Sequence, residues 1–436
     1  MLRVGEASPQ RYAPYPSTPH PSTHPLTYPP MSVTPVNAKT LSAPRLVFIF
    51  ITILFDKLGE SLIFPILPFL VGRFQSDAFT LGMLVSSYAI AQFIAIPVIG
   101  ALSDRYGRRP VMLVCVLGTA ISYFIFGFAT TLWMLFFSRI LDGVTGGVAA
   151  TAQAYIADIS PPEDRAKNFG ITGAAFGLGF TLGPAAGGAL ANISLNLPVF
   201  VAGTIALLNF VLGYFVLAES LEPDQRRPLA LRDFNPLGQL SDILRDGRIQ
   251  GLLISFFIFN FAFAGFSSIF VLFLNTRYGW GPSQAAMVFF FIGIVSTVVQ
   301  GGLIRQLLPR FGEAKLAVAG LVLVALAFGG VVLIPAGSPV LIPALYTTQA
   351  MLALGVGFVI PALRGLISIR VSAQEQGKTL GGNQALQSVA SIAGPLWAGW
   401  VFDRSGMLSP FWMGALLLVM AVGFALTNLP RRQLTT

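Results

Sequence analysis

Two carboxylates lie four residues apart in the otherwise apolar stretch LFDKLGESLIFPILPFL. If this stretch is helical, Asp56 and Glu60 share one face, and Lys57 lies about 100° around the helix. A carboxylate pair in a poorly hydrated place can take up a proton near neutral pH. The competing interpretation is charge pairing with Lys57, Arg139 or Arg364, which would only hold helices together. The residue types alone leave both interpretations open.

A second ionisable pair lies in the stretch SRILDGVTGG. Arg139 and Asp142 are three residues apart and therefore share a helix face. Placing an Arg in an apolar interior costs roughly 2.5–3.5 kcal/mol, so such a residue normally faces a polar cavity or a partner. Arg139 then tunes proton binding and Asp142 titrates, or the two neutralise each other and do no chemistry.

A third group of charges lies in GALSDRYGRRPVML, where four charged residues fall within six positions of a chain that is only 10% charged. Gly100 would let two helices approach closely, and Asp104 can accept hydrogen bonds at a helix terminus. Arg105, Arg108 and Arg109 can reach that carboxylate, neighbouring helix ends or lipid phosphate. A basic loop that only fixes membrane topology would explain the arginines, but neither the Asp nor the glycines.

The elements that must position these residues are apolar runs. The chain is 54% hydrophobic, and a bilayer core about 30 Å thick needs roughly 20 apolar residues per helix. Twelve such runs follow Arg45, near 46–71, 79–102, 110–129, 131–156, 166–190, 197–217, 250–275, 284–304, 315–334, 340–368, 378–402 and 410–429. The composition therefore predicts an all-α membrane protein with twelve transmembrane helices.

The basic residues predict its orientation. If the N-terminus is cytoplasmic, only Arg73, Arg277 and Arg404 fall in outer loops, and the other loop arginines and lysines fall inside. This asymmetry follows the positive-inside rule, so we expect both termini in the cytoplasm and the protein in a plasma membrane, the inner membrane in bacteria. The net charge of +9 does not indicate nucleic-acid binding, because the basic residues do not cluster on a soluble domain.

Several chemistries are unexpected in the membrane body. Its one cysteine, Cys115, lies within an apolar run, and both histidines, His20 and His24, lie near the N-terminus. Serine–histidine or cysteine–histidine catalysis and metal sites are therefore not expected. The sequence lacks the G-x-x-x-x-G-K-[ST] loop of ATP-driven proteins, so we expect neither an enzyme nor a bound cofactor.

The organisation along the chain suggests two equivalent halves. Residues 1–44 contain ten prolines and are predicted to be disordered, or translation begins at Met31. A polar segment at 218–249 separates the runs into six and six. Gly170 matches Gly381 and Pro184 matches Pro395 at the same offset, which predicts two pseudo-symmetric six-helix bundles. The predicted parts are the tail 1–44, the bundle 45–217, the cytoplasmic loop 218–249, the bundle 250–430 and the tail 431–436.

These motifs resemble those of the major facilitator superfamily. G-x-L-S-D-R-x-G-R-R is similar to its loop 2–3 signature, which implies a latch that holds one transport state. Arg139 and Gly143 match its R-x-x-x-G motif, and GFTLGPAAGG resembles its antiporter signature. Plain helix packing explains the glycines of that signature equally well. The residues so implied are Gly100, Asp104, Arg105, Gly107, Arg108 and Arg109 for the latch, and Gly179, Gly183, Pro184, Gly187 and Gly188 for the antiporter motif.

Within the superfamily, F-D-x-x-G-x-x-L-I-x-P-x-L-P resembles helix 1 of tetracycline-type drug/proton antiporters, which carry an Asp at the position of Asp56. The likeness extends over most of residues 45–430. It implies that Gln92, Asn260 and Gln300 face the substrate cavity, as we also expect of Arg139 and Arg364. Each polar side chain could instead bond to a neighbouring helix.

The sequence also departs from that subfamily. Tetracycline/metal exporters are expected to carry Asp, His and Asp where this chain has Ser122, Ser296 and Val324. A metal-chelated tetracycline is therefore a poor candidate. The phenylalanine-rich helices 7 and 8 and the few fixed charges of the second half favour a neutral or cationic amphipathic compound.

The resemblance implies a monomeric transporter whose partners are a small-molecule substrate, protons and membrane lipid. We expect it to export a small amphipathic drug-like or metabolite substrate in exchange for H⁺ by alternating access. One alternative is a facilitator or proton-coupled importer of a metabolite. The other is a receptor or scaffold that transports nothing.

Overall fold

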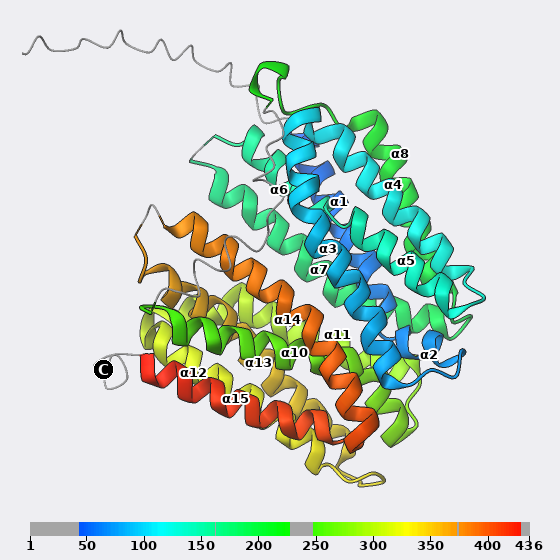
Figure 1. Ribbon diagram of the computed structural model, residues 1–436, viewed down its shortest axis with the longest axis vertical. Helices are drawn as coiled ribbons and strands as arrows, with labels where there is room; N and C mark the ends of the chain where they lie inside the picture. Colours follow the sequence, from blue (N-terminus) through cyan, green and yellow to red (C-terminus); the bar gives the residue numbers. More distant parts are fainter. Residues whose placement is uncertain (1–42, 162, 227–246, 373–374, 429–436) are drawn as a thin grey trace, which may run out of the picture. The chain divides into compact units, whose positions relative to one another are not determined.

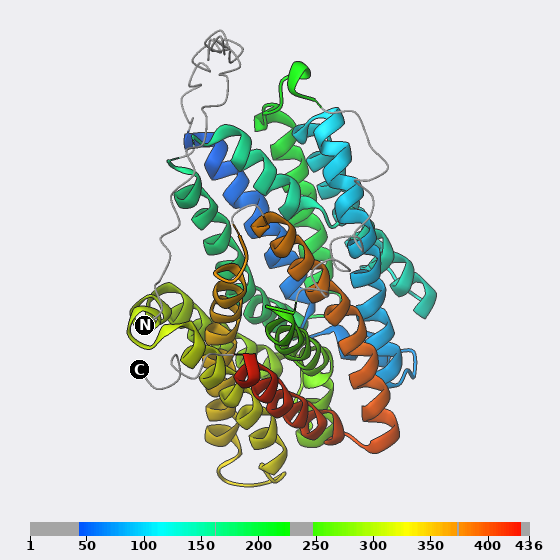
Figure 2. The ribbon, with the colours of Figure 1, turned by 60° about the vertical axis from the view of Figure 1, so that its left-hand side comes forward.

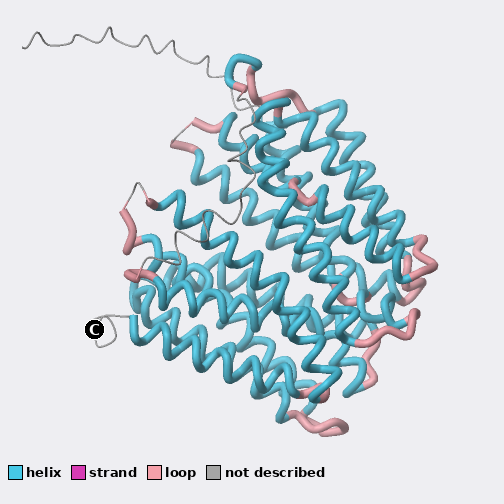
Figure 3. The backbone as a smooth tube through the Cα atoms, viewed as in Figure 1, coloured by secondary structure: helices cyan, strands magenta, loops and turns pink. Residues whose placement is uncertain are grey.

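The computed structural model describes residues 43–161, 163–226, 247–372 and 375–428. Within them, regular structure is helical, and short loops join the helices (Figure 3). Three predictions concern segments that lie wholly or mostly outside these residues. They are the disordered tail 1–44 with the alternative start at Met31, the loop 218–249, and the C-terminal tail 431–436.

The first half of the chain folds into α1 to α8, which lie together in Figure 1. Their bounds are α1 Ala43–Ile63, α2 Leu67–Gly72, α3 Ala78–Tyr106, α4 Arg108–Gly127, α5 Leu132–Thr145, α6 Val148–Ile159, α7 Arg165–Ala191 and α8 Leu197–Val216. A single 3₁₀ turn, η1 Pro223–Gln225, follows α8.

The second half folds into α10 to α15. Their bounds are α10 Gln250–Tyr278, α11 Pro282–Val298, α12 Ile304–Leu333, α13 Leu341–Ser368, α14 Gln376–Ser405 and α15 Ser409–Asn428. A π-helical turn, η3 Val299–Leu303, joins α11 to α12 without a break.

Nine stretches of the described chain are long and apolar enough to cross a membrane. One of them, Pro282–Leu333, is 52 residues long and contains Gly312 at φ 74°, a backbone conformation that interrupts an α-helix. It therefore makes two passes. Adding α1, which carries Asp56, Lys57 and Glu60, and the more polar α14 gives the twelve predicted helices. The boundaries predicted for the two bundles stay a prediction.

Some predicted spans are broken where the sequence disfavours a regular helix. The run 46–71 divides into α1 and α2 at residues 64–66, beside Pro65, which has no N–H to donate. The run 131–156 divides into α5 and α6 at Gly146 and Gly147. The run 284–304 was predicted too short, because the helix continues to the Gly312 kink.

The glycines of α7 allow close packing against α1. A methyl group at Gly187 would lie 2.2 Å from the carbonyl oxygen of Leu62, and one at Gly179 would lie 2.8 Å from Lys57 Cβ. Ser61 donates a hydrogen bond of 2.8 Å to the carbonyl of Gly179. Gly188 instead packs against α11, where an added methyl would meet Ala286. The antiporter-like motif therefore places α7 in contact with both halves.

Stacked phenylalanines fill the core of the second half. Phe266 stacks on Phe270 at 4.7 Å and on Phe328 at 4.6 Å between ring centroids, and Phe273 lies 4.6 Å from Phe411. These rings are at most 5% exposed. These phenylalanines of α10 therefore pack helices together in this conformation, and the amphipathic nature of the cargo stays a prediction.

The two halves touch at one end, defined by Ala78, Asn192, Ser283 and Asp403, which we call the closed end. Here Ser283 of α11 donates a 3.0 Å hydrogen bond to the carbonyl of Gly188 in α7. Towards mid-membrane, Ser86 of α3 donates a 2.7 Å bond to the carbonyl of Ile392 in α14. Figures 1 and 2 both show α3 and α14 converging on this end.

The same helices separate towards the other end, defined by the Tyr106–Arg108 turn and the start of α14, which we call the basic end. A methyl group at Gly100, Gly173, Gly301 or Gly377 would meet no heavy atom beyond its own helix within 4 Å. These glycines lie in α3, in α7, in the turn after α11 and in α14. In the described residues, the hydrogen bonds between the halves lie at the closed end and midway along the helices, so the halves separate towards the basic end.

The packing of α7 on α1 generates a stability prediction. Gly187→Ala forces a methyl group against the Leu62 carbonyl and should cost about 1–3 kcal/mol, because the backbone cannot give way easily. The apparent thermal midpoint in detergent should fall. Gly177→Ala in the same helix is the matched control, since its methyl group meets nothing within 4 Å. An equal midpoint for the two variants would contradict the assigned contact.

Candidate functional site

The two carboxylates of α1 share one ammonium group. Lys57 Nζ lies 3.2 Å from Asp56 Oδ2 and 2.6 Å from Glu60 Oε2. The lysine is 8% exposed and also lies over the ring of Phe176, 5.1 Å from its centroid. The alternative of charge pairing with Lys57 is thus realised in this conformation, and Arg364 takes no part in it. The proton-binding role of Asp56 and Glu60 stays a prediction.

Neither carboxylate is fully enclosed by these contacts. The side chains of Asp56 and Glu60 keep 16% and 24% of their surface exposed. Asp56 also lines a cavity of about 10 Å³ together with Thr119, Tyr123 and Asn209, among others. That volume is close to the smallest that holds one water molecule. The cavity beside Asp56 therefore has room for about one water molecule inside the first half.

Arg139 and Asp142 form the second ion pair of the first half. Arg139 Nη2 lies 2.8 Å from Asp142 Oδ2, and the two residues are 7% and 4% exposed. The guanidinium also lies over the rings of Tyr88, Tyr123 and Phe126, with centroids at 5.4, 5.8 and 5.1 Å. Aromatic faces attract a cation, so this cage holds the arginine where water is scarce.

The glycine of the R-x-x-x-G motif brings this pair close to α3. A methyl group at Gly143 would lie 2.5 Å from the carbonyl oxygen of Tyr88. Gln92, one turn along α3, donates to the hydroxyl of Tyr88 at 2.8 Å and to the carbonyl of Gly146 at 3.2 Å. Gln92 therefore bonds to the neighbouring helix, which was the alternative to a cavity-facing role.

Together the two groups form a cluster of three carboxylates and two cations, which we call the charge cluster: Asp56, Lys57, Glu60, Arg139 and Asp142. Asp142 interacts electrostatically with Asp56 and Glu60 as well as with Arg139. With every group ionised, the charge cluster carries one net negative charge. One bound proton, or one cationic group of a ligand, makes it neutral.

The other predicted cavity residues lie apart from this cluster. Asn260 of α10 donates to the carbonyl of Phe256 at 2.7 Å and is 7% exposed. Arg364 lies one turn before the end of α13, where it donates to Gln387 at 2.9 Å and lies over the ring of Phe256. Gln300 is exposed in the π-helical turn η3. Their contact with a substrate stays a prediction.

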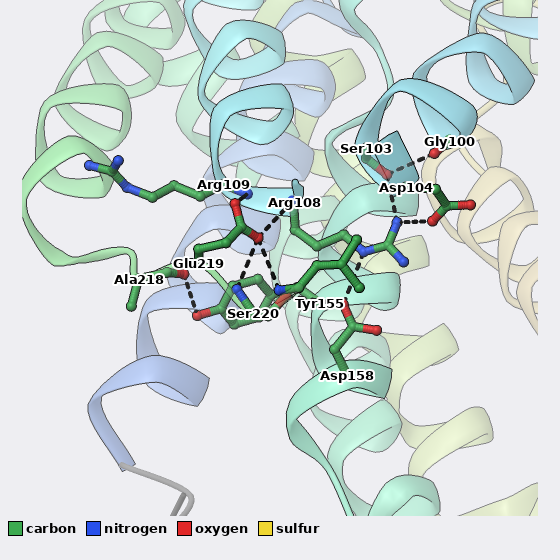
Figure 4. Close-up of polar contacts among 11 residues, drawn as sticks. Gly100, Ser103, Asp104, Arg108, Arg109, Tyr155, Asp158, Ala218, Glu219 and Ser220 are labelled. Carbon is green, nitrogen blue, oxygen red and sulfur yellow. Dashed lines mark hydrogen bonds and ion pairs between the residues drawn. The ribbon is translucent and has the colours of Figure 1, made fainter. Parts of the chain in front are cut away.

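The predicted latch forms a tight polar network at the basic end (Figure 4). Arg108 pairs with Asp104, bonds to Asp158 Oδ2 through Nε at 3.0 Å, and donates from Nη1 to Ser103 Oγ at 2.7 Å. Gly107, at φ 106°, connects α3 to α4 in a conformation that favours glycine. Arg108 is thus the centre of the latch.

The other latch residues make different contacts. Arg109 donates to the carbonyl of Tyr214 near the end of α8 at 2.7 Å, and Arg105 lies over the ring of Tyr106. Among the three arginines, then, only Arg108 pairs with the carboxylate of Asp104 in the described chain. The prediction that Gly100 lets two helices approach closely is wrong for this conformation, because a methyl group at Gly100 would meet no atom of another helix within 4 Å.

Glu219, which the sequence reasoning missed, is the anchor of this network. Its carboxylate accepts hydrogen bonds from the backbone N–H groups of Arg108 at 2.8 Å and Arg109 at 3.2 Å, and also from those of Ser220 and Leu221. It thereby caps α4 from a different part of the chain. A side chain at Gly107 would collide with this carboxylate. The sequence signal for this role was the position of Glu219, an acidic residue just after the apolar run 197–217 that ends the first half.

No group of three or more His, Cys, Asp or Glu side chains in the described residues is arranged to hold a metal ion. The acidic residues of the site are instead paired with Lys57, Arg108 or Arg139. The chemistry that this arrangement supports is the binding and release of protons and of charged ligand groups.

Curated proteins of similar sequence are resistance transporters. The chain is 36% identical over 354 residues to the tetracycline resistance protein of class C from Escherichia coli, covering 80% of this chain and 88% of that protein. It is 30% identical over 394 residues to multidrug resistance protein 2 of Bacillus subtilis strain 168, covering 89% and 96%.

Solved structures share the fold. The human organic anion transporter MFSD10 superposes with a TM-score of 0.67 at 25% identity, covering 89% of this chain and all of that one. The nucleoside transporter NupG superposes with a TM-score of 0.72 at 14% identity, covering 88% and 98%. The sequence pattern of the Major Facilitator Superfamily matches residues 49–347 and 306–435. With its twelve helices in two six-helix bundles, the chain therefore belongs to the Major Facilitator Superfamily of membrane transporters.

Proposed function

We propose that this protein exports a small amphipathic compound across the plasma membrane in exchange for protons, by alternating access. The observation that carries the proposal is the charge cluster, which holds one carboxylate more than it holds cations. A cluster that is neutral only with one proton or one cationic group bound makes the two ligands compete. Competition for one site in both orientations couples their opposite movements.

The direction of transport follows from the predicted orientation. With the basic end in the cytoplasm, the conformation described is open inward. In this state the substrate binds and a proton leaves a carboxylate of the charge cluster. In the outward-open state a proton from outside returns to the carboxylate, and the cargo is released. The relatives that carry tetracycline and multidrug resistance in their names support export.

On this proposal, the substrate is not a metal-chelated tetracycline. Val324 and Ser122, which stand where tetracycline/metal exporters are expected to carry acids, are fully buried. Val324 packs in the core of the second half, and Ser122 donates to the carbonyl of Thr119 within α4. Neither offers a ligand to a metal, so we infer an amphipathic compound without a bound metal.

One observation favours a second function. Lys57 contacts both carboxylates of α1, and such an arrangement can be purely structural. The protein would then be a facilitator or importer of a metabolite that moves without proton exchange. The two functions differ in whether a pH gradient alone drives substrate accumulation in vesicles.

Replacement of Asp56 tests the coupling. Asp56→Asn removes the excess negative charge of the cluster, so it should reduce pH-gradient-driven transport in vesicles about tenfold or more while substrate counterflow continues. Asp224→Asn, at an exposed carboxylate outside the membrane helices, is the matched control. If both activities of the Asp56 variant equal those of the unchanged protein, the assignment of proton coupling to Asp56 is wrong.

The latch generates a separate prediction. Asp104→Asn weakens the pair with Arg108 at an exposed position, so turnover should fall while the thermal midpoint is unchanged and substrate affinity stays within a few-fold. Glu219→Ala is the contrasting variant, because it leaves capped backbone groups of α4 without partners and should lower the thermal midpoint. Unchanged turnover in the Asp104 variant would refute its role in switching.

A further inference from the structure

At the closed end, α3 and α14 run antiparallel with their backbones in direct contact. A methyl group at Gly399 would lie 2.4 Å from the carbonyl oxygen of Ala78, and one at Gly82 would lie 2.4 Å from that of Pro395. Asp403 lies one turn beyond Gly399 on the same face of α14. The small residues therefore bring its carboxylate to the first turn of α3.

Asp403 binds that turn with both of its oxygens. Oδ1 accepts a hydrogen bond of 3.1 Å from the N–H of Ala78, and Oδ2 accepts one of 2.8 Å from the N–H of Phe79. The first N–H groups of a helix have no partner within it and carry partial positive charge. A carboxylate at this position is therefore a strong, oriented contact.

The rest of the same turn is capped from within the first half. Asp77 Oδ1 accepts from the N–H of Thr80 at 2.8 Å and from its hydroxyl at 2.6 Å. One helix end thus binds two carboxylates of the same type, of which Asp77 belongs to its own half and Asp403 to the opposite one. Only the contact with Asp403 must break when the halves separate here.

We propose that Asp403 is the latch of the closed end, a cap supplied by one half to a helix of the other that stabilises the conformation open at the basic end. The inference rests on the proposed alternation between two open states. Asp104, at the other end of α3, pairs in this conformation with Arg108 of its own half. The engaged bond between halves is therefore at the closed end.

If the halves separated here, the carboxylate of Asp403 and the N–H groups of Ala78 and Phe79 would form hydrogen bonds with water instead of with each other. Loss of these charge-assisted bonds should shift the equilibrium between the two open states by about tenfold. Asp403→Asn keeps the shape and one acceptor oxygen, so it should still fold and shift the equilibrium part of the way. Asp403→Ala should give the full shift.

Distances between spin labels across the closed end measure this equilibrium. Labels at Thr130→Cys and Ala336→Cys, in exposed loops of the two halves, can be placed in a Cys115→Ser background, since the chain has one cysteine. Pulsed electron paramagnetic resonance should show a second, longer distance between the labels. In Asp403→Ala the population with this longer distance should be about tenfold larger than in the unchanged protein. Asp403→Asn should lie between the two.

Asp77→Ala is the matched control, because it removes a cap from the same helix end without breaking a bond between the halves. Hydrogen bonds from the hydroxyl and the N–H of Thr80 hold the pKa of Asp77 below its usual range, so this carboxylate is ionised near neutral pH. Its variant should keep the original distances. An unchanged distribution in Asp403→Ala, or an equal shift in Asp77→Ala, would overturn the latch. Since no substrate or pH gradient is used, failure of proton coupling alone would leave this result intact.

Discussion

Charge placed inside an apolar protein must be balanced, and this requirement organises the membrane body. Breaking a buried ion pair by removing one partner costs about 3–5 kcal/mol, because it leaves a charge without compensation. Lys57 between two carboxylates and Arg139 beside Asp142 satisfy that requirement. The small imbalance that remains, one negative charge among five groups, is the feature on which a transport function can act.

The balance also constrains how the helices pack. Lys57 and both of its carboxylate partners lie on α1, and the glycines of α7 let that helix pack closely against α1. Arg139 lies among aromatic rings, and Gly143 lets its helix approach α3 closely. The glycine motifs and the charges are thus parts of one arrangement. At the basic end the same principle recurs in Arg108, whose charge is shared by Asp104 and Asp158 while Glu219 fixes the start of the next helix.

Much of this could be predicted from the sequence, because apolar runs and short motifs are local signals. The twelve helices follow from the apolar runs, and the family follows from the resemblance of the motifs. The three-residue spacing placed Arg139 and Asp142 on one helix face and left open whether they pair, and the structure shows that they do. The partners of Arg108 could not be derived in this way, because Asp158 of α6 and Glu219 of the segment after α8 are brought to it only by the tertiary fold. Nor could the sequence tell that no other helix packs against Gly100, since that depends on how the two halves are oriented.

The cores of the two halves contain different types of residue. The first half holds the charge cluster, whereas α10 and its neighbours hold stacked phenylalanine rings with almost no exposed surface. Aromatic cores tolerate exchange of residues of similar volume far better than ion pairs tolerate the loss of a member. Volume-preserving substitutions among the stacked rings of the second half should therefore disturb the fold less than removal of one member of the charge cluster in the first half.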